Sequence, residues 1–232
     1  MNAIITGASR GIGKAIAHMF GLHGYNLVLG SQSEATLLAT AEELQTRFPH
    51  ITVAAKALNL GNKDEARLFA EWAAGAADTV DVLVNNAGTF LPGTILDSAD
   101  DVMEKTMAVN FYSAYWITKE LLPKLIAQGS GHIFNMGSIA GLQAYPNGGA
   151  YSISKYALMG FSKNLRHELM PHGIKVTTVI PGAVYTDSWA PFVAPERIME
   201  AGDIAQMIYA CSRLSPQAVV EDLIMRPLLG DL

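Results

Sequence analysis

The sequence lacks the features that would tie it to an oxidising compartment, to nucleic acid or to a membrane. Its 232 residues contain one cysteine, Cys211, which excludes an intramolecular disulfide framework and suits a reducing compartment. The formal net charge of −5 provides no basic footprint for nucleic acid and no polybasic helix for an anionic membrane. We therefore expect a cytoplasmic protein that binds neither nucleic acid nor membranes.

Long apolar runs and metal-ligand spacings are absent as well. No apolar run approaches about eighteen residues and the N-terminus has no basic region, so we expect neither a membrane span nor a signal peptide. We predict no metal site, and we interpret as surface or capping residues the histidines His18, His23, His132, His167 and His172. Charged residues form only 16% of the chain, which suggests apolar surface covered by a second subunit.

Half of the residues are apolar, and apolar runs alternate with segments of helical periodicity. We expect strands at residues 2–6, 26–30, 51–58, 80–84, 131–137, 174–180 and 219–225. We expect helices at residues 14–23, 33–48, 63–77, 151–171 and 203–214. Residues 100–128 should form one long helix or two abutting helices, with a bend at Pro123. Continuous apolar strands joined through helices are typical of a parallel sheet covered on both faces. We predict an α/β fold in a single domain over residues 1–232, with a doubly wound, mostly parallel sheet of about seven strands and helices on both faces.

A tyrosine and a lysine four residues apart, Tyr151 and Lys155, would share one face of the helix expected at 151–171. A cation beside a phenol favours the phenolate and lowers its pKa, which suggests acid and base chemistry. Ser138 follows the strand at 131–137, and its hydroxyl would orient a substrate oxygen if it folds back over Tyr151. By itself, however, this spacing more often reflects packing and a solvated lysine, so it needs support from other motifs.

A glycine-rich turn, Gly-Ala-Ser-Arg-Gly-Ile-Gly at residues 7–13, joins the first expected strand to the first expected helix. Its glycines allow a tight turn and a close approach to a ligand, and the N-terminus of the helix offers free N–H groups to a pyrophosphate. In parallel sheets, ligands lie beyond the carboxyl ends of the strands, where this turn and Ser138 are both expected. The pattern therefore predicts nucleotide binding.

Several motifs together resemble, in order and spacing, the short-chain dehydrogenase/reductase family. They are Thr-Gly-Ala-Ser-Arg-Gly-Ile-Gly at 6–13, Asn-Asn-Ala-Gly at 85–88, Asn110, Ser138, Tyr-Ser-Ile-Ser-Lys at 151–155 and Pro-Gly-Ala-Val-Tyr-Thr at 181–186. The resemblance covers essentially the whole chain. It implies a Rossmann-like fold and hydride transfer between a nicotinamide cofactor and a carbonyl or alcohol substrate.

The resemblance also implies roles for single residues. Tyr151 would exchange a proton with the substrate oxygen, Ser138 would polarise the carbonyl, and Lys155 would lower the tyrosine pKa and bind the nicotinamide ribose. Asn110 would hold a water that joins Lys155 to solvent. The residues expected to bind cofactor are Gly7, Ser9, Arg10, Gly11, Ile12, Gly13, Ser31, Gln32, Asn59, Leu60, Asn86, Ala87, Gly88, Tyr151, Lys155, Pro181, Gly182, Val184 and Thr186. The residues expected to contact substrate are Ser138, Leu142, Tyr145, Tyr151 and Trp189.

Cofactor preference depends on the end of the second strand. An acidic residue there would bind the ribose 2′-hydroxyl of NAD and repel a 2′-phosphate, but no carboxylate occurs before Glu34. Arg10 in the glycine turn can reach toward that phosphate. We predict NADP(H), with NAD(H) as the alternative. Asn59 stands where the family usually has aspartate near the adenine, and an amide can also hydrogen-bond a base.

The leading interpretation is an NADP(H)-dependent reductase of a ketone or aldehyde, including a 3-oxoacyl thioester on an acyl-carrier protein. Two alternatives remain open: an NAD(P)-dependent alcohol or sugar dehydrogenase running oxidatively, and a nucleotide-binding sensor without turnover. The family resemblance further implies a homodimer or homotetramer. Trp189 and Phe192 follow the 181–186 motif and either contact substrate as a lid or pack on the core or another subunit.

Overall fold

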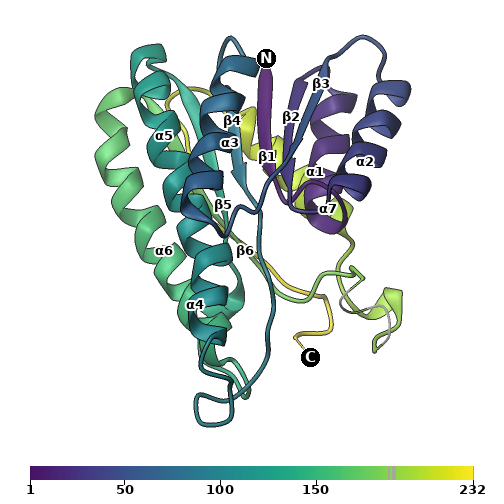
Figure 1. Cartoon of the computed structure of the whole chain (residues 1–232), viewed down its shortest axis with the longest axis vertical. Helices are drawn as coiled ribbons and strands as arrows, with labels where there is room; N and C mark the ends of the chain where they lie inside the picture. The colour runs from purple at the N-terminus through teal and green to yellow at the C-terminus, as the bar shows by residue number, and fades with distance from the viewer. Residues whose placement is uncertain (188, 190–191, 232) are drawn as a thin grey trace.

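The computed structural model describes residues 1–187, 189 and 192–231, and its centre is a parallel sheet with strand order β3-β2-β1-β4-β5-β6-β7 (Figure 1). The strands are β1 (Asn2–Thr6), β2 (Asn26–Ser31), β3 (Val53–Ala57), β4 (Val82–Asn85), β5 (Gly131–Met136), β6 (Ile174–Pro181) and β7 (Asp222–Met225). All six neighbouring pairs are parallel. The predicted doubly wound parallel sheet is therefore confirmed. The chain reverses its direction across the sheet between β1 and β4, the place where such folds bind ligands.

Helices cover both faces of this sheet. One face carries α1 (Gly11–Leu22), α2 (Glu34–Arg47) and α7 (Ala201–Ser212), and the other carries α3 (Lys63–Ala76), α5 (Ser113–Gln128) and α6 (Gly149–Leu169) (Figure 1). The two faces have separate hydrophobic cores. Ile5 of β1 packs in the first core and Ile4 in the second, because successive strand residues point to opposite faces. Burial on both faces explains the continuous apolar runs.

A π-helix (Ala108–Tyr112) lies between α4 (Val102–Met107) and α5. Pro123 lies inside α5, and the departure from α geometry comes at Ala108–Tyr112, so the segment is divided ahead of the proline. The bend expected at Pro123 stays a prediction. The wider turn includes Asn110, whose buried side chain bonds to groups on other elements. Apolar periodicity contains no signal for such an insertion, and π-turns often occur at functional sites.

His132 is buried, so its interpretation as a surface or capping residue is wrong. It lies on the central strand β5, stacked on Phe134, with its Nε2 2.7 Å from Thr177 Oγ1. Burial and the charge of Lys175 lower its pKa to about 3, so the ring stays neutral. Among the described residues, no cluster of metal-ligating side chains occurs. Within the same part of the chain, no helix is both long and apolar enough to cross a membrane.

Candidate active site

The glycine turn places the N-terminus of α1 at the carboxyl end of β1. Gly7 and Gly11 have φ values of +63° and +54°, a region that residues with a Cβ rarely adopt. At Gly13, a Cβ would lie 2.1 Å from the Gly7 carbonyl oxygen. The turn can therefore close only with glycine at Gly13, and it leaves the first N–H groups of α1 facing the cleft described below.

Asn86, just after β4, holds this turn from the neighbouring strand. Its Nδ2 donates to the carbonyl oxygens of Thr6 at 3.0 Å and Gly7 at 3.2 Å. The Thr6 hydroxyl in return accepts from the backbone N–H groups of Asn86 at 2.9 Å and Ala87 at 3.0 Å. The amide of Asn86 is thus used to shape the cleft wall.

A cleft of about 610 Å³ runs along this edge of the sheet. Fourteen of the residues expected to bind cofactor line it: Gly7, Ser9, Arg10, Gly11, Ile12, Gly13, Ser31, Gln32, Asn59, Leu60, Asn86, Ala87, Gly88 and Thr186. Sequence reasoning did not include five further lining residues, Ser33, Thr36, Gly61, Val109 and Asp187. Ser33 and Thr36 had a usable signal, since they start the helix after β2 at the same edge.

The remaining residues expected to bind cofactor do not line this cleft: Tyr151, Lys155, Pro181, Gly182 and Val184. Val184 is only 4% exposed and packs in the core beneath α1 and α7, where its backbone bridges to Met199. The chain after β6 turns this side chain inward, so the expected cofactor contact of Val184 stays a prediction that its side chain does not support.

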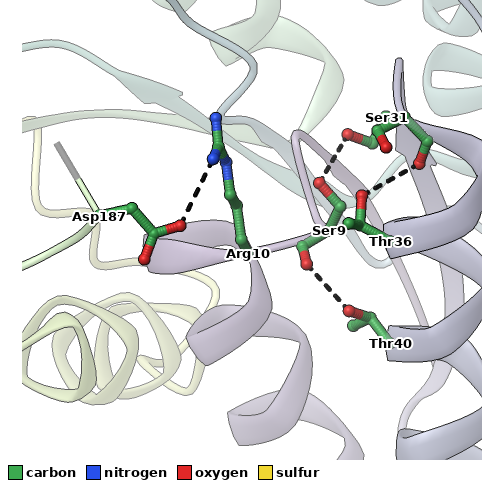
Figure 2. Close-up of polar contacts among 7 residues, drawn as sticks. Ser9, Arg10, Ser31, Thr36, Thr40 and Asp187 are labelled. Atoms are coloured by element: carbon green, nitrogen blue, oxygen red, sulfur yellow. Dashed lines mark hydrogen bonds and ion pairs between the residues drawn. The ribbon is translucent and has the colours of Figure 1, made fainter.

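Hydroxyl groups fill the end of the cleft between β1 and β2. Ser9 Oγ lies 2.9 Å from Ser31 Oγ, and Thr40 Oγ1 donates to the Ser9 carbonyl oxygen at 2.9 Å (Figure 2). Thr36 Oγ1 donates to the Ser33 carbonyl oxygen at 3.3 Å. No carboxylate follows β2 on the cleft wall. An acidic residue at this place would repel a phosphate, so its absence allows a phosphate to bind there.

Asn59 lines the cleft beyond β3. Its Oδ1 accepts from the Gly61 N–H at 3.1 Å, and its own N–H donates to Glu65 Oε2 at 2.7 Å. The bond from Gly61 holds the side-chain oxygen of Asn59, so Nδ2 is the donor that the side chain can offer to a ligand. An adenine ring nitrogen is an acceptor of the kind this donor fits.

Ser138, Tyr151 and Lys155 lie together beyond β5. Ser138 is 8% exposed and accepts a hydrogen bond from the Ala140 N–H at 3.2 Å. Lys155 is 5% exposed, donates from Nζ to the Met136 carbonyl oxygen at 2.7 Å, and has its Nζ 5.6 Å from the centre of the Tyr151 ring. Tyr151 and Lys155 share one face of α6, as their spacing predicts.

Burial dominates the electrostatics of this group. It raises the pKa of the Tyr151 phenol above its ordinary value, and the hydrogen bond with Ser138 opposes this rise without reversing it. Burial also lowers the pKa of Lys155 to about 8. The expected lowering of the tyrosine pKa by the ammonium is therefore wrong for this structure, in which Lys155 is bonded to Met136 instead.

Asn110 connects three elements of the site. Its Oδ1 accepts from the Thr89 N–H at 2.7 Å, and its Nδ2 donates to the Thr89 carbonyl oxygen and to Ser154 Oγ, both at 3.0 Å. Ser154 Oγ donates in turn to the Tyr151 carbonyl oxygen at 2.7 Å. Asn110 thus positions the turn of α6 that carries Tyr151 and Lys155.

Two aromatic side chains, Phe90 and Tyr145, lie near Tyr151. Phe90, which sequence reasoning did not include, packs edge-on against the Tyr151 ring with 4.9 Å between ring centres. Burial and the nearby Tyr151 raise the pKa of Tyr145 to about 12. Leu142 is 39% exposed and belongs to the same loop as Tyr145. Trp189 is half-buried, and its backbone N–H donates to the Thr186 carbonyl oxygen.

A model of the short chain dehydrogenase family matches residues 1–197. The chain belongs to this family. Among its relatives is a Xenopus laevis dehydrogenase/reductase SDR family member 7B, 35% identical over 192 residues, or 79% of this chain and 58% of that one. An uncharacterized oxidoreductase of Staphylococcus saprophyticus is 30% identical over 227 residues, or 97% of this chain and 96% of that one. The chain spans less than two thirds of the length of the animal relatives.

Solved short-chain dehydrogenase structures show the same architecture. An alcohol dehydrogenase from Thermococcus sibiricus, complexed with 5-hydroxy-NADP, superposes with a TM-score of 0.91 at 27% identity, over 99% of this chain and 97% of that one. An L-sorbose reductase from Gluconobacter frateurii, complexed with NADPH and L-sorbose, superposes with a TM-score of 0.88 at 27% identity, over 96% and 94%.

Proposed function

We propose that this short-chain dehydrogenase is an NADP(H)-dependent oxidoreductase that reduces the carbonyl group of a small ketone or aldehyde. The observation that carries the proposal is the grouping of Ser138, Tyr151 and Lys155 beyond β5, at the same edge of the sheet as the glycine-turn cleft. The cleft residues fit a dinucleotide, since the turn admits no side chain at Gly13 and presents N–H groups where a pyrophosphate would lie.

The bound cofactor supplies the hydride, and the side chains described above manage the proton and the geometry. The Ser138 hydroxyl orients the carbonyl oxygen, and the Tyr151 phenol donates a proton to it. The raised pKa of Tyr151 keeps the phenol protonated near neutrality, which is the form that reduction requires. Lys155, with a pKa of about 8, titrates close enough to neutrality to return a proton to Tyr151.

The preference for NADP(H) rests on the chemistry of the β2 end of the cleft. Ser31, Gln32 and Ser33 offer hydroxyl and amide groups there, and Arg10, on the glycine turn of the same cleft, offers a guanidinium. A 2′-phosphate is recognised by such donors, and arginine binds phosphate through two parallel N–H groups. Phe90 and Tyr145 next to Tyr151 favour a substrate with an apolar body over a sugar.

The test is oxidation of NADPH, and separately of NADH, across a panel of ketones, aldehydes, sugars and a 3-oxoacyl thioester. We expect turnover with an apolar ketone and a lower KM for NADPH than for NADH. Tyr151→Phe, which keeps the ring packed against Phe90 but removes the proton donor, should lose at least about a hundredfold in kcat. Full turnover by this variant would refute the mechanism, and a clear preference for NADH would refute the cofactor assignment.

The assembly in this proposal is a homodimer or homotetramer. Large side chains stay exposed on the outer face of the π-helix and α6: Tyr112 is 46% exposed, Ile153 40% and Tyr156 47%. A second subunit packed on these helices would cover them. Light scattering at micromolar concentration should therefore give a mass of at least two chains, and a purely monomeric mass would contradict the assembly.

A further inference from the structure

An ion pair joins two segments of the cofactor cleft that are far apart in the sequence. Arg10 Nη1, in the glycine turn, lies 3.4 Å from Asp187 Oδ2, in the segment after β6 (Figure 2). The two segments also meet next to this pair, because a Cβ built on Gly11 would lie 3.3 Å from the Thr186 methyl group. Arg10 and Asp187 both line the cleft.

The charges make this pair distinctive. Among the described residues that line the cleft, Arg10 is the only cation and Asp187 the only carboxylate. Their side chains are 76% and 74% exposed, so water and salt screen the pair and a stronger anion can displace the carboxylate. A phosphate monoester carries nearly two negative charges at neutral pH and offers more acceptor oxygens than a carboxylate.

We propose that Asp187 is a specificity-determining residue whose carboxylate competes with the ribose 2′-phosphate of NADP(H) for Arg10. The inference rests on the proposed binding of a nicotinamide dinucleotide in this cleft. The guanidinium cannot present the same N–H groups to both anions, and the carboxylate also repels the phosphate. NAD(H) has no 2′-phosphate and is indifferent to the competition. Asp187 therefore weakens the binding of NADP(H) but not of NAD(H), and so reduces the preference for NADP(H) that Arg10 creates.

The test uses equilibrium binding, so it does not depend on turnover. Adenosine 2′,5′-bisphosphate and adenosine 5′-monophosphate are titrated calorimetrically into the wild type, Asp187→Asn, Arg10→Gln and the double variant. Glu196→Gln is the matched control, because it removes an exposed carboxylate from the same connection after β6 but outside the cleft. NADPH and NADH are titrated in the same way.

We expect Asp187→Asn to bind the 2′-phosphorylated ligands about two- to fivefold more tightly, the range set by one exposed ion pair. Binding of adenosine 5′-monophosphate and NADH should not change. The gain should vanish in the Arg10→Gln background and shrink at high salt. Glu196→Gln should bind every ligand as the wild type does.

An equal gain for both kinds of ligand, a gain matched by Glu196→Gln, or no gain at all would overturn the competition. A gain that persists without Arg10 would overturn it as well. These outcomes leave the proposed function intact as long as the wild type binds NADPH or NADH. A wild type that binds no dinucleotide would refute both proposals together.

Discussion

Lys155 should lower the stability of the folded protein, because its ammonium group is buried. Burial lowers its pKa from 10.5 to about 8. The unfolded chain therefore binds more protons than the folded chain between pH 8 and pH 10.5. Wild-type stability should rise with pH across that window, and the full penalty of the buried charge should be present below pH 8.

The size of the effect follows from this change in pKa. A fall of about 2.5 corresponds to about 3 kcal/mol in the free energy of unfolding at pH 7. Lys155→Met keeps the length of the side chain and removes this penalty, but it deprives the Met136 carbonyl oxygen of its donor at a cost of about 1 to 2 kcal/mol. We expect the variant to be about 1 to 2 kcal/mol more stable than the wild type at pH 7 and to lose turnover.

Urea unfolding at pH 7 and pH 10 measures this difference. The advantage of Lys155→Met should shrink by about 2 kcal/mol at pH 10, where the folded wild type holds a neutral amine that keeps its hydrogen bond. Lys163→Met is the control, since Lys163 is exposed on the same helix and should show no such pH dependence. A variant less stable than the wild type at pH 7, or an equal difference at both pH values, would refute the reasoning.

Three further substitutions test the site. Gly13→Ala should lower the free energy of unfolding by about 2 to 4 kcal/mol, because its Cβ would meet a backbone carbonyl oxygen. Gly75→Ala, at an open helical position, should be neutral or stabilising. Equal effects of the two substitutions in urea titrations would contradict this reasoning. Asn110→Ala should cost about 2 to 3 kcal/mol through three lost hydrogen bonds, and wild-type stability in the same assay would argue against its positioning role. Phe90→Ala, which removes the ring packed on Tyr151, should raise KM for an apolar ketone several-fold without changing KM for NADPH; an unchanged ketone KM would exclude Phe90 from the pocket.

Much of the fold and the cleft was readable from the sequence. Continuous apolar runs marked the central strands, and β1 lies at the residues expected for it. The bounds of the edge strands were predicted less accurately. Strand β7 was expected to begin at residue 219, but it begins at Asp222, where its pairing with β6 starts. Motifs after each strand could be placed together because the carboxyl ends of parallel strands share one edge of the sheet. The glycine turn could also be predicted, because its backbone conformation at Gly7 and Gly11 disfavours other residue types.

Local sequence patterns therefore determined which elements form, their order in a parallel sheet, and the edge at which Ser138, Tyr151 and Lys155 meet. Only the tertiary structure decided what surrounds those groups. Burial reversed the expected direction of the Tyr151 pKa shift. The path of the chain after β6 placed the Val184 side chain in the core. The pairing of Arg10 with Asp187 joins residues 177 positions apart. Desolvation and long-range charge pairing depend on how distant segments pack, and no local pattern in the sequence encodes that packing.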